Sequence, residues 1–150
     1  MIGTDTVDAA EIRRLIPHGG SMCLIEQVVQ WDLRTIHCRT RTHLDPAHPL
    51  RRDGGLSALH LVEYGAQAMA IHGGLEARSR GATAAPGLLV SVRDLRLEVQ
   101  QIDDLEGPLE LHAEQQLASS SGWLYDFRAL CGERLLGSGR IAVMSDNSFR

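Results

Sequence analysis

A carboxylate and an amide stand at helical spacing within the one long stretch that has the pattern of a buried helix. In residues 54–74 (GGLSALHLVEYGAQAMAIHGG), Glu63 and Gln67 are four positions apart, which puts their side chains on the same side of a helix. Gln67 could hold the Glu63 carboxyl by a hydrogen bond, and burial would favour the protonated form of that carboxyl. Glu63 is therefore a candidate general acid. The alternative is a surface or salt-bridged glutamate.

Histidine is the side chain that most often supplies the other half of such acid–base chemistry. His60 precedes Glu63 by three residues, so the two share a helix side, and His60 is either a second base or a packing residue. The remaining histidines show no spacing that suggests a metal site, and His43 and His48 could join in one only if the fold brought them together. We therefore expect no metal and no cofactor.

The helix that must position these groups has one apolar face. Apolar or small residues recur at the spacing of a buried helical stripe, at Leu59, Val62, Ala66, Met69 and Gly73. Glycine weakens a helix relative to alanine, so Gly65 predicts close approach by another part of the backbone. We expect Ser57 or Asp53 to cap this helix, which should fray by Arg80.

Around this helix, the sequence predicts strands. Six runs alternate with the period of half-buried antiparallel strands, at 22–31, 34–42, 88–99, 108–118, 122–130 and 134–144. A short helix is expected over 6–16, with Thr6 as its N-cap and its end before Pro17. Residues 43–55 lack a period and form a long, irregular approach to the buried helix. These elements predict a single α+β domain, residues 1–150, whose antiparallel sheet wraps around one long central helix.

Composition excludes several classes of function. The net charge is −4 and all 15 basic residues are scattered arginines, so no basic face for nucleic acid is expected. No apolar run reaches 18 residues, and the first 14 residues lack a signal-peptide core, so no membrane segment is expected. The 3 cysteines form no CxxC pair, which disfavours a disulfide framework or zinc site and fits a reducing, cytoplasmic location.

Three segments, at residues 15–31, 63–70 and 132–144, resemble those of the β-hydroxyacyl-acyl carrier protein dehydratases, a family with the hot-dog fold. Residues 15–31 (LIPHGGSMCLIEQVVQW) are similar to the opening of that family, and residues 132–144 (GERLLGSGRIAVM) are similar to its last strand. The helix segment EYGAQAMA places Glu63 and Gln67 at the positions of the family's E-A-x-A-Q motif. Within the group, the chain most resembles the dehydratase-like proteins of aryl-polyene and xanthomonadin-type pigment clusters.

The resemblance implies a lyase that dehydrates a β-hydroxyacyl thioester, with a histidine and Glu63 as base and acid. His48, followed by Pro49, is the nearest equivalent of the family's catalytic histidine. It lies one residue further from Glu63 and lacks the following Phe-Pro-Gly, so an ordinary loop histidine is the alternative. Backbone amides at the start of the helix, at Gly55 and Leu56, would bind the thioester carbonyl. Gln67 and His60 would complete the substrate-binding set.

The resemblance also implies partners. An acyl carrier protein would deliver the substrate, and two hot-dog chains, identical or different, would pair with their long helices side by side and share each site between subunits. Two other functions stay open. The chain could be a non-catalytic subunit that pairs with an active dehydratase, or a thioesterase in which Glu63 alone activates water.

Overall fold

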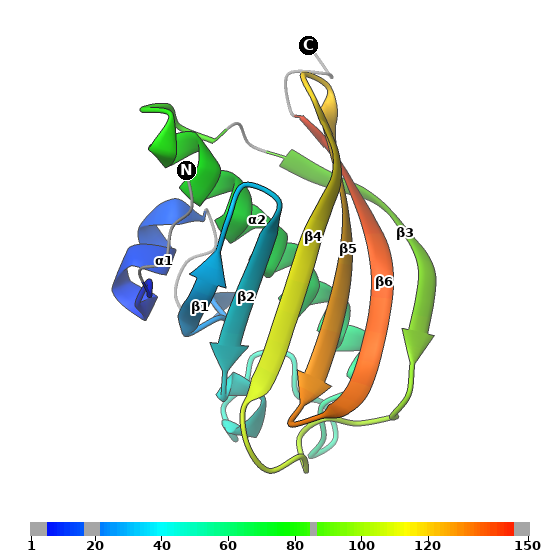
Figure 1. The fold of residues 1–150 in the computed structure, drawn as a ribbon. Helices are drawn as coiled ribbons and strands as arrows, with labels where there is room; N and C mark the ends of the chain where they lie inside the picture. Colours follow the sequence, from blue (N-terminus) through cyan, green and yellow to red (C-terminus); the bar gives the residue numbers. More distant parts are fainter. Residues whose placement is uncertain (1–5, 17–21, 85–86, 146–150) are drawn as a thin grey trace.

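The computed structural model describes residues 6–16, 22–84 and 87–145. One six-stranded antiparallel sheet curls around the long helix α2 (Figure 1). The helices are α1 (Ala9–Leu15) and α2 (Leu61–Ser79), with short 3₁₀ turns at Thr42–Leu44 and Ala58–His60. The strands are β1 (Gln27–Trp31), β2 (Thr35–Thr40), β3 (Gly87–Leu97), β4 (Leu109–Ser119), β5 (Gly122–Cys131) and β6 (Arg134–Ser145). The expected α+β architecture is confirmed.

The strand order in the sheet is β1-β2-β4-β5-β6-β3. Strand β3 follows α2 in the chain but pairs with β6, and it forms one edge of the sheet. Its first three leucine and valine residues, Leu88, Leu89 and Val90, are about half exposed. An edge strand with exposed apolar side chains is a natural pairing surface.

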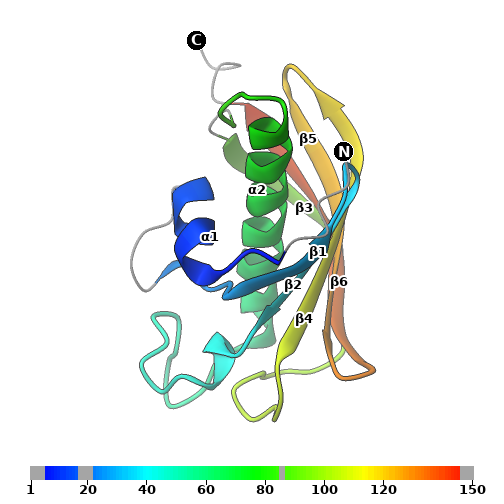
Figure 2. The same cartoon turned by 60° about the vertical axis from the view of Figure 1, so that its left-hand side comes forward.

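Helix α2 crosses the concave face of the sheet, and α1 lies beside it on the same side (Figure 2). Gly65 allows this close packing, because a Cβ atom at that position would lie 2.7 Å from Cγ of Phe127 on β5. The predicted close approach is therefore made by an aromatic ring, not by a backbone. None of the helices in the described ranges has the length and apolar character that spanning a bilayer requires.

The predicted start of the long helix at residue 54 is wrong. Residues 56–58 instead run alongside residues 100–102, with bonds from Ala58 N to Gln100 O (2.9 Å) and from Ile102 N to Leu56 O (2.9 Å). Ser57 caps the 3₁₀ turn by accepting the amide of Leu59 at 3.1 Å. The helix then runs through Gly73 and Gly74 to Ser79, with Arg80 as its C-cap, close to the expected end.

Two further boundaries differ from the prediction. Asp8, not Thr6, caps α1, because its carboxylate accepts the Glu11 amide at 3.0 Å. Strand β1 begins at Gln27 instead of residue 22, since the backbone of residues 22–24 bonds to a helix side chain. Residues 17–21 of the opening motif lie outside the described residues.

Candidate functional site

Glu63 lies in the first turn of α2 and is half-buried. Gln67, one turn later, donates from Nε2 to Oε1 of Glu63 at 3.0 Å. The i, i+4 pairing expected from the sequence is therefore present in the helix. Oε1 is thus the oxygen of the Glu63 carboxyl that accepts from the Gln67 amide.

The Gln67 amide is fixed in one orientation by the extended segment beside it. Its side chain is 0% exposed. Nε2 donates its second hydrogen to Met22 O at 2.7 Å, while Oε1 accepts the Leu24 amide at 2.8 Å. A flipped amide would set a donor against the Leu24 N–H and an acceptor against the Met22 carbonyl. Gln67 thus always presents a donor to Glu63.

His48 lies on the irregular approach to the helix, and both of its ring nitrogens are bonded within the chain. Nδ1 accepts the Leu50 amide at 3.1 Å, and Nε2 lies 3.1 Å from the Tyr64 hydroxyl. An amide can only donate, so in the neutral ring the hydrogen must be on Nε2. Burial lowers the pKa of His48, and the His60 charge lowers it further. His48 therefore stands as a neutral ring turned toward the core, 5% exposed.

Tyr64 connects His48 to strand β2. Its hydroxyl lies 2.8 Å from Oγ1 of Thr42, just beyond the end of that strand. Thr42 Oγ1 is in turn 2.7 Å from Leu24 O, and Oγ1 of Thr40 is 2.6 Å from the same carbonyl. Tyr64 is fully buried, and burial raises the pKa of its hydroxyl. That hydroxyl also makes specific hydrogen bonds, to His48 and to Thr42.

The amides expected to bind a thioester carbonyl are already paired. Gly55 N donates to Arg52 O at 3.0 Å, and Leu56 N donates to the carboxylate of Asp103 at 2.9 Å. Leu56 is also 0% exposed. His60 occupies the 3₁₀ turn ahead of α2 and is half-buried. The structure thus brings Glu63 and Gln67 together and gives Gly55 and Leu56 structural partners.

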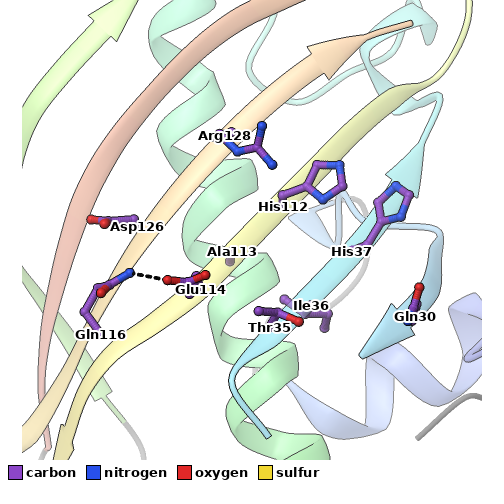
Figure 3. A pocket seen from close by; sticks show the side chains of 10 residues that line it. All are labelled: Gln30, Thr35, Ile36, His37, His112, Ala113, Glu114, Gln116, Asp126 and Arg128. Atoms are coloured by element: carbon purple, nitrogen blue, oxygen red, sulfur yellow. Dashed lines mark hydrogen bonds between the residues drawn. The ribbon is translucent and has the colours of Figure 1, made fainter. Parts of the chain in front are cut away.

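A shallow hollow of about 480 Å³ lies on the outer face of the sheet, away from α2 (Figure 3). Two of the residues that line it, His37 and His112, are stacked with ring centroids 4.2 Å apart. The acidic residues around the rings carry arginine partners, in the pairs Arg39–Glu110, Arg34–Glu114 and Arg140–Asp126. This pattern is typical of a solvated polar sheet face, and the hollow does not include Glu63.

Sequence reasoning missed Tyr64, Thr42, Thr40 and Leu24 as parts of the network. Only one signal was present: a tyrosine that directly follows Glu63 and precedes the small residues Gly65 and Ala66. Thr42 lies 22 positions from Tyr64 and contacts it only because β2 packs against α2. No local spacing can reveal such a contact.

Comparison with solved structures supports the fold. The chain matches the structure described as the dehydratase heterocomplex ApeI:P from Xenorhabdus doucetiae with TM-score 0.82 and 23% identity, over 92% of each chain. It also matches a hypothetical thioesterase with coenzyme A from Streptococcus pneumoniae TIGR4 (TM-score 0.58, 10% identity, 79% of this chain and 83% of the other). AziG of S. sahachiroi matches with TM-score 0.58 and 15% identity, over 88% and 98% of the chains. The hot-dog fold is confirmed.

Comparison with protein families identifies the group. No protein with curated function matches the chain in sequence. The family model described as ApeP-like, ApeP dehydratase, matches residues 10–150, which includes Glu63, Gln67 and all the strands. The resemblance to the dehydratase-like proteins of aryl-polyene clusters is confirmed. The chain belongs to the ApeP-like dehydratase family.

Proposed function

We propose that this chain is one subunit of a β-hydroxyacyl thioester dehydratase and that Glu63 is its catalytic acid. The observation that carries the proposal is the clamp on Glu63: a fully buried Gln67 amide, held by the backbone of residues 22–24, donates to Oε1. A surface glutamate needs no such buried support. Preorganised groups of this kind are typical of catalytic sites.

The chemistry is an elimination of water. A base removes the proton on the carbon next to the thioester carbonyl, and the Glu63 carboxyl gives a proton to the β-hydroxyl as that group leaves. The electron pair of the broken C–H bond forms the double bond, and the products are the enoyl thioester and water. The proton taken by the base returns to Glu63 through solvent, which restores the acid.

The base is best supplied by a second subunit. For His48 to act, its ring would have to leave both Tyr64 and Leu50, because the neutral ring uses Nδ1 as acceptor and Nε2 as donor. The ApeI:P structure is described as a heterocomplex, and we extend that arrangement to this chain. The half-exposed apolar edge of β3 supports pairing with another hot-dog chain. His60, half-buried and near the start of α2, is the alternative base within the chain.

Membership of the family supports a proposal for the substrate carrier, and the cysteines support one for the location. We propose that an acyl carrier protein presents the β-hydroxyacyl group and that the reaction takes place in the cytoplasm. The three free cysteines suit a reducing compartment.

A thioesterase is the second candidate. Its specific support is that His48 is engaged in the core, since a carboxylate-activated water requires Glu63 alone. The two reactions have different products, because hydrolysis releases a free thiol and dehydration forms a conjugated enoyl thioester without releasing thiol.

Glu63→Gln tests the acid, with Glu76→Gln as the matched control on the same helix. Glu76 pairs with the exposed Arg80, so its substitution should leave turnover unchanged. The assay mixes the full chain, alone and with a second hot-dog subunit, with β-hydroxyacyl thioesters of an acyl carrier protein, and follows water loss by mass spectrometry and thiol by a colour reagent. We expect dehydration to fall by about 10²-fold or more in Glu63→Gln. Unchanged water loss in that variant would overturn the catalytic assignment, and thiol release by the unmodified chain would favour the thioesterase.

A further inference from the structure

Tyr64 is adjacent to Glu63 but faces the sheet, and its hydroxyl belongs to a chain of hydrogen bonds with one possible direction. At one end, the Leu50 amide donates to His48 Nδ1. The His48 ring must then donate from Nε2 to Tyr64, and the Tyr64 hydroxyl donates to Thr42 Oγ1. At the other end, the Thr42 hydroxyl donates to the Leu24 carbonyl, which can only accept. Two backbone groups thus fix every donor in between.

Leu24 is where this chain meets the clamp on Glu63. Its carbonyl accepts from Thr42 and Thr40, at 2.7 and 2.6 Å, and its amide donates to Gln67 at 2.8 Å. Leu24 lies outside any strand, so sheet pairing does not hold this peptide in place. Side chains from α2 and from the end of β2 do so instead.

We propose that Tyr64 is a positioning residue for Glu63: through Thr42 and Leu24 it fixes the Gln67 amide and hence the direction of the Glu63 carboxyl. The inference rests on the proposed function. Glu63 and Tyr64 point to different sides of α2, so no direct contact is required. Both residues belong to the helix, and the contacts that connect them run from Tyr64 through Thr42 and Leu24 to Gln67, which bonds Glu63.

The chain offers a matched control for this role. Tyr125 on β5 is also buried, at 2% exposure, and burial raises its pKa in the same direction as that of Tyr64. Its hydroxyl also bonds a buried histidine, His72, and an amide, Gln115, at 3.1 Å from the latter. His72 Nε2 is bonded to Asp32 O at 2.8 Å, so this second network does not include Leu24 or Gln67.

The test compares Tyr64→Phe with Tyr125→Phe in the complex that dehydrates the substrate. Both variants lose one buried hydroxyl and should lose similar stability in thermal unfolding. We expect only Tyr64→Phe to lower kcat, by roughly ten-fold, with KM little changed, because the acid is misdirected while the acyl-binding surface is kept. Equal kcat in the two tyrosine variants would overturn the proposal.

A second readout does not depend on activity. Hydrogen exchange of the Leu24 amide, followed by NMR, should be about ten-fold faster in Tyr64→Phe and unchanged in Tyr125→Phe. Thr42→Val should reproduce the effect, and it keeps the assay decisive if Tyr64→Phe folds poorly. Normal Leu24 protection in both Tyr64→Phe and Thr42→Val would also overturn the inference. If Glu63→Gln retains full turnover, the proposed function fails, while the Leu24 exchange result still decides whether Tyr64 holds this segment.

Discussion

At the scale of single residues, Gln67 is the group on which the candidate site depends most. Its amide makes three bonds, to Met22, Leu24 and Glu63, and so connects the helix to a segment more than 40 positions earlier. A buried polar side chain with this many partners is costly to remove, because each partner left behind loses its hydrogen bond without regaining water.

Gln67→Leu should therefore lower the free energy of unfolding by about 3 kcal/mol, since it leaves the Leu24 amide and the Met22 carbonyl without a side-chain partner. Gln115→Leu is the control: Gln115 is half-buried and its amide bonds the Tyr125 hydroxyl, so we expect a loss of about 1 kcal/mol. Urea unfolding of both variants measures the difference. Equal losses would contradict the importance given to Gln67.

The residue scale also shows what the sequence can and cannot predict. The Glu63–Gln67 bond follows from helix geometry, which is local, and it was predicted. The role of His48 remains a prediction, and its ring partner could not be anticipated, because Tyr64 is 16 positions away and the approach loop has no regular path. The hydrogen bonds of the Gly55 and Leu56 amides could not be predicted for the same reason. Their partners, Arg52 and Asp103, are placed by the geometry of the loops.

At the scale of elements, the packing around α2 is tight at some positions and open at others. Two glycines of the helix, Gly65 and Gly73, show the difference. A Cβ atom at Gly65 would overlap Phe127, whereas a Cβ atom at Gly73 would meet nothing within 4 Å. Helix propensity alone favours alanine at both positions by about 1 kcal/mol, so packing decides the sign.

We expect Gly65→Ala to destabilise the fold by about 1–3 kcal/mol, because the added methyl group must displace a buried aromatic ring. Gly73→Ala should stabilise it by about 0.5–1 kcal/mol. Thermal unfolding of the two variants provides the test. A stabilised Gly65→Ala protein would mean that Phe127 can move aside without cost.

The presence of each helix and strand was predicted more accurately than the residues at which it begins and ends. Alternation and helical spacing indicated all six strands and both α-helices. The start of α2 was placed too early because residues 54–57 share its composition, yet Gly55 pairs with Arg52, and Leu56 and Ala58 bond to residues 100–102. Strand β1 was predicted too long for a related reason: residues 22–26 have strand-like side chains but bond to Gln67, Thr40 and Thr42.

At the scale of the whole molecule, the sheet order could not be derived from the sequence. Neighbours such as β4, β5 and β6 pair through short turns, which alternation and turn residues predict. The pairing of β3 with β6, across 36 intervening residues from Leu97 to Arg134, depends on how the sheet closes around α2. The same closure leaves β3 at an edge with its apolar side chains exposed.

The exposed edge at β3 predicts that the chain pairs with a second hot-dog chain in solution. Leu89→Arg should disrupt pairing with a second hot-dog chain and leave a folded monomer of 16.4 kDa, because a charge cannot be buried there without a partner. Leu117→Arg is the control, since Leu117 on β4 is 60% exposed but lies away from the edge strands. Light scattering gives the mass of each complex. An unchanged assembly in Leu89→Arg would exclude β3 as the interface.

Stability should also depend on pH through the buried histidines. Burial lowers the pKa values of His43, His48 and His72 from their ordinary value of 6.5. Below that pH, the unfolded chain binds protons that the folded chain does not. The free energy of unfolding is therefore highest above about pH 6.5. It decreases as the pH drops below that value, by up to about 1.4 kcal/mol per pH unit for each ring.

Urea unfolding at pH 7.5, 6.5 and 5.5 checks this dependence. His72→Gln should reduce the slope, since it deletes one of the titrating rings. Constant stability over this range, or greater stability at pH 5.5, would contradict the burial of neutral histidines.

The edge position of β3 has a further consequence for how the chain is made. Strand β3 leaves the ribosome well before β6, its one neighbour in the described sheet. Until β6 emerges, β3 is a free strand with exposed leucine and valine side chains and no ladder to join. Such long-range pairing is slow, and an unpaired strand can associate with other chains before the pairing forms. Synthesis next to a partner hot-dog subunit would protect β3 during this interval, because an edge strand of the partner can pair with the side of β3 that β6 does not use.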